Sequence, residues 1–241
     1  MRATLENKEK NNKPVKRNKI KTTLIVLLGL AVILVVASAL LWKMLFYAPP
    51  SYQPAKPVNP EQVSPYLTHK LGPDFINNIQ LDDPFNILVE QQGLNDIVAR
   101  WNWPMDTGIA VIETPVAVFE PQNIVLMARM NFGQFPVITT ITFSPTIDDQ
   151  GLFVLNLRDV QAGAVNITPM ATSFIVSMID AELNSAPADE DTQWLSNVRA
   201  AVLDNTPFDP VFPVDAQKDV RLSKVDLEKD KLTIQLTPIN K

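Results

Sequence analysis

The sequence predicts an α+β protein in which one N-terminal membrane-spanning helix precedes a single domain of antiparallel strands and amphipathic helices. Three patterns predict this class: an uncharged run of 21 residues, two-residue alternation of apolar side chains through residues 109–160, and apolar residues at helical spacing after Pro169. The chain has 241 residues, and the part after the apolar run is long enough for one domain with its own core.

The uncharged run extends from Thr22 to Trp42 and is long enough to cross the hydrocarbon layer as a helix. At about 1.5 Å per residue, 21 residues span roughly 30 Å. We expect the helix to occupy residues 22–46, because Pro49-Pro50 cannot continue it. The tail of residues 1–21 carries eight basic and two acidic side chains. The positive-inside bias therefore predicts a cytoplasmic tail at the cell (inner or cytoplasmic) membrane and an extracytoplasmic C-terminal domain.

A cleaved signal peptide is the alternative interpretation of the same segment. Ala37-Ser38-Ala39 resembles a small-residue cleavage site. The apolar run, however, exceeds the usual core of a signal peptide, which is about 7–15 residues, and it continues past that site. These two observations favour an uncleaved single-pass anchor.

Residues 47–84 have the composition of a linker. They contain eight of the chain's 20 prolines and few large apolar residues before Phe75. Such a stretch favours extended polyproline II and acts as a semi-rigid spacer. We therefore expect a proline-rich linker over residues 47–84, with a weak helix signal at 74–79, and an extracytoplasmic α+β domain over residues 85–241.

Within that domain the apolar pattern changes several times between strand and helix periods. A short strand at 85–89 precedes a helical stripe at 94–101, and a meander of about four strands follows at 109–119, 123–131, 135–147 and 151–160. Asp148-Asp149-Gln150-Gly151 predicts a tight turn between the last two. Helical stripes at 170–183 and 194–203 and a strand hairpin at 220–237 complete the chain.

Composition excludes several classes of function. There is no cysteine, so disulfides and thiol chemistry are absent, and the single histidine, His69, lies in the expected linker. Residues after Lys43 carry 12 basic and 24 acidic side chains, and this acidic balance argues against nucleic-acid binding. No phosphate-loop, dinucleotide, nucleophile-elbow or zinc-protease motif occurs. We therefore expect no enzyme activity, no metal and no cofactor.

Two other groups of residues have an open interpretation. The acidic runs at 82–83, 148–149 and 189–191 fall in expected linkers and turns, where solvated charge is the usual outcome. Trp101 and Trp103 could face a ligand, although such residues more often cap a core.

Two segments resemble motifs of small anchored bacterial envelope proteins of the YpmS-type family and its LmeA-like and YceB-like relatives. The first is FNILVEQQGLN at residues 85–95, a hydrophobic strand followed by Glu90 and Leu94-Asn95. The second is DQGLFVLNLRDVQAG at residues 149–163. A proline-led helix at 169–183 and a terminal strand hairpin also match the order of elements in those relatives.

The resemblance implies a TULIP-like fold, in which a curved antiparallel sheet wraps a long helix and leaves an apolar groove for lipid. It implies no catalytic residues. We expect the groove to be lined by apolar side chains of the meander and of the following helix, namely Ile124, Leu126, Ile141, Phe143, Phe153, Leu155, Phe174 and Met178. The expected function is binding of lipid or another hydrophobic ligand at the cell envelope.

A structural or interaction module is the alternative function. Such a module would bind another envelope protein through a sheet edge or through the acidic segment near residues 187–191.

Overall fold

The computed structural model describes residues 17–56, 58, 61–172, 197, 199–201, 205–214 and 217–240. The chain divides into two compact units, residues 1–43 and 44–241. The predicted helices at 170–183 and 194–203, like the acidic segment at 187–191, fall largely or wholly outside the described residues. Residues 168–172, where the first of these helices was expected to begin, are helical.

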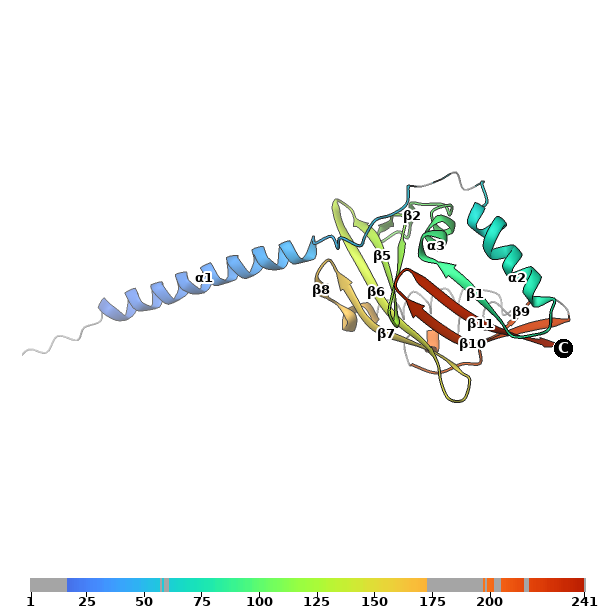
Figure 1. The fold of residues 1–241 in the computed structure, drawn as a ribbon. Helices are drawn as coiled ribbons and strands as arrows, with labels where there is room; N and C mark the ends of the chain where they lie inside the picture. Colours follow the sequence, from blue (N-terminus) through green and yellow to red (C-terminus); the bar gives the residue numbers. More distant parts are fainter. Residues whose placement is uncertain are drawn as a thin grey trace, which may run out of the picture. The chain divides into compact units, whose positions relative to one another are not determined.

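The first unit consists of the apolar helix α1 (Arg17–Leu45), drawn in blue in Figure 1. Its stretch Thr23–Leu45 is long and apolar enough to cross a membrane, and none of the stretch is buried in protein. The described residues contain one helix of this kind. Ser38, the one hydroxyl within its second half, donates to the Leu34 carbonyl and so exposes no unpaired donor. The prediction of one N-terminal apolar helix that fits a single-pass anchor is confirmed.

The second unit begins at Met44 and therefore includes the segment expected to be a linker. Tyr52 packs against Val116, Val125, Met127 and Ile138, and its phenolic oxygen accepts a hydrogen bond from Arg129 N at 3.2 Å. Further along, the chain forms a π-helical turn η1 (Leu67–Leu71) and helix α2 (Gly72–Ile79). These residues contact the domain instead of standing clear of it as an extended spacer.

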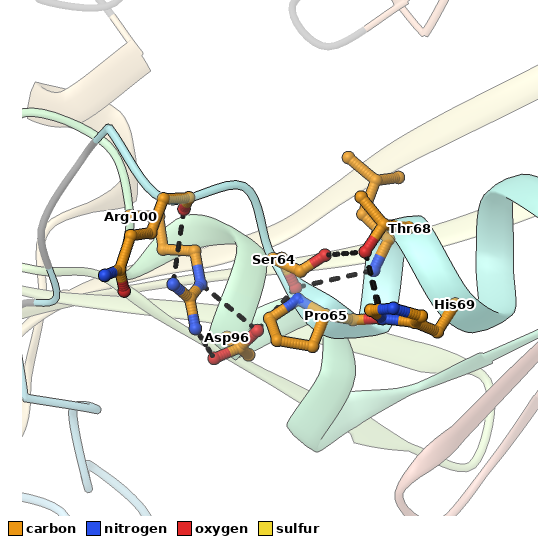
Figure 2. A network of polar contacts seen from close by, with 8 residues as sticks. Ser64, Pro65, Thr68, His69, Asp96 and Arg100 are labelled. Carbon is orange, nitrogen blue, oxygen red and sulfur yellow. Dashed lines mark hydrogen bonds and ion pairs between the residues drawn. The ribbon is translucent and has the colours of Figure 1, made fainter.

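Ser64 and Pro65 explain why a helix begins inside this proline-rich segment. Ser64 is buried, its carbonyl accepts from Thr68 N at 3.0 Å, and its hydroxyl oxygen accepts weakly from Leu67 N at 3.4 Å. Serine is a favoured N-cap, and proline is tolerated at the first helical position because its missing N–H would have no partner there. Figure 2 shows Ser64 at this helix start, beside Asp96 and Arg100.

A four-stranded antiparallel sheet joins the first strand of the domain to its last strands, in the order β1-β11-β10-β9. Its members are β1 (Phe85–Glu90), β9 (Val211–Pro213), β10 (Lys218–Glu228) and β11 (Lys231–Asn240). β10 and β11 form the predicted C-terminal hairpin, and β1 pairs with β11 from Phe85 opposite Leu236 to Glu90 opposite Lys231. One face of β1 buries Phe85, Ile87 and Val89, as the alternating sequence predicts.

A seven-stranded sheet contains the predicted meander, and every pairing in it is antiparallel. Its path is β2-β3-β5-β6-β7-β8, with β4 beside β5. The long strands β5, β6 and β7 lie next to one another in Figure 1. The members are β2 (Met105–Asp106), β3 (Val111–Ile112), β4 (Val116–Glu120), β5 (Asn123–Phe132), β6 (Phe135–Ile147), β7 (Phe153–Ala162) and β8 (Val165–Asn166).

Local turn chemistry fixes the predicted β6–β7 connection. Gly151 has a φ of 79°, a conformation that only glycine adopts readily. The Asp148 carboxylate accepts from Gln150 N and Leu152 N, both at 2.9 Å. An aspartate that bonds its own following backbone in this way stabilises a tight turn.

The main core lies between the two sheets and below helix α2. Phe119 of β4 packs with residues of β1, β10 and β11 and with Ile79, and it is 1% exposed. Helix α3 (Gln91–Val98) closes the outer edge of β4, since the Asn95 side chain bonds both Ala117 N and Ala117 O at 2.8 Å. The α+β class with a mostly antiparallel domain is thus confirmed.

Candidate functional site

The register of β5 and β6 aligns apolar side chains on one face of the seven-stranded sheet. Residues that lie directly opposite each other in an antiparallel pair project from the same face. Five such pairs occur on this face, and we call them the apolar track: Ile124–Phe143, Leu126–Ile141, Ala128–Thr139, Met130–Val137 and Phe132–Phe135. Eight residue steps separate the first and last pairs, so the track is about 26 Å long at about 3.3 Å per residue.

Strand β7 extends the same face sideways. Val160 lies opposite Ile141, and Leu157 lies opposite Phe143. The register shifts between Thr142 and Phe143, and on the same side of this shift as Leu157, Leu155 and Phe153 lie opposite Pro145 and Ile147. Six of the eight predicted groove residues therefore share one face: Ile124, Leu126, Ile141, Phe143, Phe153 and Leu155. The other two, Phe174 and Met178, lie outside the described residues.

The two faces of the sheet differ in burial. Leu126 on the track is 39% exposed, and Ile124, Ile141 and Phe143 are partly buried. On the opposite face Met127 is only 1% exposed, beneath the segment that carries Tyr52. The N-terminal segment of the unit thus covers the second face, while Leu126, Phe132 and Phe135 keep apolar surface of the track accessible to solvent. Val137 on the track and Val160 beside it are buried.

The two ends of the track also differ. At one end Ile124 packs against the main core next to Phe119. At the other end Phe132 is 41% and Phe135 is 54% exposed. The track therefore runs from a closed end at the core to an open end at the β5–β6 turn, with one polar side chain, Thr139, among its ten members.

A separate hollow of about 430 Å³ lies at the opposite face, and no predicted groove residue lines it. Its walls are Tyr52, Pro54, Ala55, Lys56, Trp103, Pro104, Glu113 and Thr114. The Glu113 carboxylate already accepts from Asn131 at 2.9 Å and pairs with Arg129 at 3.6 Å. We favour the track as the candidate site for an apolar ligand, because two charged residues, Lys56 and Glu113, line this hollow and the Glu113 carboxylate is already bonded within the protein.

The tryptophan pair is divided between this hollow and solvent. Trp103 donates from its indole nitrogen to the Val98 carbonyl at 2.8 Å and lines the hollow. Trp101 stacks on it with ring centres 6.4 Å apart and is 60% exposed. Trp101 is therefore a surface residue and does not cap the core.

The fold brings one serine, one histidine and one aspartate close together, which the sequence did not predict. Ser64 donates its hydroxyl to the Asp96 carboxylate, whereas His69 Nδ1 lies 3.1 Å from the Pro65 carbonyl and 3.1 Å from Thr68 Oγ1. Figure 2 shows that the Ser64–Asp96 contact joins the helix start to α3, whereas the contacts of His69 stay within the helix start. A catalytic triad needs the histidine between the serine and the aspartate. The bonds described here hold the helix start in place instead.

Charge around Asp96 supports this structural role. Arg100 donates to Asp96 from Nη2 at 3.0 Å and from Nε at 3.3 Å, and also to the Gln62 carbonyl. The Arg100 guanidinium, and after it the Ser64 hydroxyl, hold the pKa of Asp96 below its usual value. Asp96 therefore stays ionised, as a salt-bridge partner and not as a proton donor.

Two other groups have shifted pKa values, and both lie in structural contacts. The hydrogen bond to Glu90 raises the pKa of Lys70, whose Nζ lies 2.6 Å from that carboxylate. Burial raises the pKa of Tyr52, partly opposed by its bond to Arg129 N. Among the described residues no three His, Cys, Asp or Glu side chains are grouped so as to hold a metal ion.

Comparison with known proteins adds no family to this description, since no family model and no curated protein matches the chain.

The six described residues of the predicted groove share one face, but the sequence pattern did not predict the full extent of the track. Phe132, Phe135, Met130 and Val137 belong to it, and the alternation along residues 123–147 carried the signal for all four. The contact of Tyr52 with the opposite face had no comparable signal, because a single aromatic residue among prolines has no periodicity.

Proposed function

We propose that this chain is a membrane-anchored, extracytoplasmic, non-catalytic protein that binds the hydrocarbon part of a lipid, or a similar hydrophobic ligand, along the apolar track. The observation that carries the proposal is the run of five same-face pairs from Ile124–Phe143 to Phe132–Phe135. Removing apolar surface from water stabilises a complex by about 0.8 kcal/mol for each buried CH₂ group. A surface with one hydroxyl among ten side chains offers an acyl chain this stabilisation with little polar desolvation.

The anchor supports the same proposal. Helix α1 would hold the domain beside the bilayer, where such ligands are concentrated, and the basic tail at 1–21 favours an extracytoplasmic domain at the cell membrane. A TULIP-like arrangement, with a helix lying over the curved sheet, belongs to this proposal as well. The helix that would take that place begins at residues 168–172.

A photoreactive fatty acid tests the proposal in the full-length chain reconstituted into phospholipid vesicles. We expect a 16-carbon fatty acid with a diazirine near its methyl end to label peptides of β5 and β6, as mapped by mass spectrometry. Leu126→Asp should reduce labelling several-fold, because a carboxylate would replace an exposed apolar side chain of the track. Adducts spread evenly over exposed apolar residues, with no excess on the track, would contradict the proposal.

Leu88→Asp is the matched control. Leu88 is 38% exposed, close to the 39% of Leu126, but it belongs to β1 in the other sheet. Its substitution adds the same charge at the same exposure and should leave labelling unchanged. Melting temperatures of both variants would show that each remains folded.

The alternative, a module that binds an envelope protein through a sheet edge, has less support from the described edges. β2, β8 and β9 offer only two or three residues each, and short edges are poor templates for an added strand. The longer edge of β7 is bonded at Val160, to Ile167 and Thr168, and at Phe153, to Phe208, so its stretch at 154–159 is the edge that best fits this alternative. The outer edge of β1 is contacted by Tyr66, whose hydroxyl accepts from Glu90 N at 2.8 Å and donates to the Leu88 carbonyl at 3.2 Å.

A further inference from the structure

The β5–β6 turn ends in an uncharged aromatic tip. Phe132 and Phe135 face each other across the two-residue turn Gly133-Gln134, in which Gly133 has a φ of 63°. They are 41% and 54% exposed. The β2–β3 turn beside this hairpin carries Ile109, which is 61% exposed and lies two residues before Val111, the partner of Asn131. We call Phe132, Phe135 and Ile109 the hairpin tip.

The β5–β6 part of the hairpin tip carries no charge, and beside Ile109 the Asp106 carboxylate accepts from Gly108 N within the β2–β3 turn. From Met130 to Ile147 there is no Asp, Glu, Lys or Arg, and the nearest charged residue before this stretch, Arg129, is paired with Glu113. Exposed apolar side chains that cluster on a protein surface mark sites of interaction with a protein or a membrane. Phenylalanine and aliphatic side chains can insert a few Å into the boundary between the headgroups and the acyl chains of a bilayer.

A hydrogen bond places this end of the sheet near the point where the chain leaves the membrane-spanning stretch. Within the second unit, Ala164 N in the β7–β8 turn donates to Met44 O at 2.8 Å. The neighbouring Gly163 has no room for a side chain, because a Cβ there would collide with the carbonyl oxygens of Met44 and Leu45. Met44 and Leu45 are the last two residues of the stretch that can span a membrane.

The β-sheet register gives the distance from that point to the hairpin tip. Gly163 N donates to Ile138 O at 2.8 Å, so the β7–β8 turn lies level with Ile138 on β6. Gln134 is four residues away along the same hairpin, about 13 Å at about 3.3 Å per residue. The interfacial region of a bilayer adds roughly 5–8 Å to each side of the hydrocarbon layer. The hairpin tip is therefore within reach of the membrane surface.

We propose that the hairpin tip docks into the interfacial layer of the membrane that holds the anchor, so that the open end of the apolar track meets the bilayer. The occupant is the lipid surface itself, and Phe132, Phe135 and Ile109 supply the apolar contact. The chain then has two attachments to one membrane, a spanning helix and a shallow hairpin. This docking does not depend on whether the track itself binds a ligand.

The absence of cysteine makes a direct test practical, since one introduced cysteine gives one labelled position. Gln134→Cys in the full-length chain would carry the fluorophore NBD at the hairpin tip, in vesicles of phosphatidylcholine and phosphatidylglycerol. We expect a blue-shifted emission and at least threefold stronger quenching by lipids with a nitroxide near the headgroup than at a control site.

Lys229→Cys is the control, because it lies at the far end of the strands. In the turn that contains Lys229, Asp230 N donates to Phe119 O at 3.1 Å. Phe119 lies opposite Ile124, so this turn is at the closed end of the track. Equal quenching at both positions would overturn the proposal. A blue shift at position 134 without lipid quenching would overturn it too, and would indicate a second copy or another protein as the occupant.

A second variant identifies the side chains responsible. Adding Phe132→Ser and Phe135→Ser to Gln134→Cys should lower the lipid quenching to the level of Lys229→Cys. A melting curve on the same sample checks that the sheet is intact. If quenching persists in the folded double variant, the aromatic pair does not dock the domain and the proposal fails.

Discussion

Ser64 donates its hydroxyl hydrogen to the carboxylate of Asp96, 32 residues further along the chain. Asp96 lies on α3, and Ser64 caps the helix that leads into α2. The bond fastens the proline-rich segment to the domain at a position that is only 2% exposed. This relationship makes residues 61–84 part of the fold.

Removing the Ser64 hydroxyl should therefore destabilise the whole unit. Ser64→Ala deletes a helix cap and a hydrogen bond to a charged partner, and we expect the free energy of unfolding to fall by about 2 kcal/mol. Urea unfolding of the full-length chain in detergent, followed by circular dichroism, measures the change. Ser38→Ala is the matched control, because that hydroxyl bonds only within α1 and its loss should leave unfolding of the domain unaltered.

The lowered pKa of Asp96 predicts a pH dependence. Its ordinary value is 3.8, and Arg100 followed by Ser64 lowers it in the folded state. The stabilisation is therefore fully present above about pH 4 and is lost as the pH falls through the folded-state value. Unfolding measured between pH 2 and pH 6 should show the stability gap between the wild type and Asp96→Asn closing at the acid end. A gap that is constant over this range would mean that Asp96 has no shifted pKa.

A chain that begins at Phe85 should fold poorly compared with one that begins at Met44. The shorter chain loses Phe75 and Ile79 from the main core and Tyr52 from the second face of the sheet. Each buried side chain of this size stabilises by about 1.5–3 kcal/mol, and a whole domain is stable by only about 5–15 kcal/mol. Thermal unfolding and proton NMR dispersion of the two chains would test this. Similar melting temperatures for both would show that residues 44–84 are not needed by the fold.

Two phenylalanines in the same sheet should respond differently to truncation. Phe119→Ala opens a cavity at a site that is 1% exposed, and it should cost about 3–5 kcal/mol. Phe135→Ala removes a side chain that is 54% exposed and should change the stability by less than about 1 kcal/mol. Denaturant unfolding of the two variants measures both effects. If Phe135→Ala were as damaging as Phe119→Ala, the hairpin tip would be part of the core and not a docking surface.

Local patterns in the sequence predicted most elements of the fold. Alternation over residues 135–147 predicted β6 to the residue, because side chains of a strand project alternately to its two faces. The turn at Asp148–Gly151 followed from residues that stabilise turns by themselves. The same alternation predicted which side chains of β5, β6 and β7 would share a face.

Contacts between distant segments were not predictable in this way. The helix signal at 74–79 was weak, and it lay in a stretch whose proline content favoured an extended chain. The spacer was predicted from this composition alone, whereas the structure has helix α2 there. Ser64-Pro65 is a helix-start signal that could have been recognised there. The helix is stabilised by the core against which Phe75 and Ile79 pack, and the local sequence does not show this contact.

By itself the sequence determined the apolar helix, the strand periods and the tight turns, because each depends on residues within a few positions of one another. Only the tertiary structure decided that β1 pairs with β11, that Tyr52 covers one face of the sheet, and that the apolar track ends at Phe132 and Phe135. These contacts depend on which surfaces can be buried together after loops of many residues close. Loop closure leaves no periodic pattern in the chain. Contacts of this kind, made by Tyr52, Phe75 and Ile79, include the proline-rich segment in the domain.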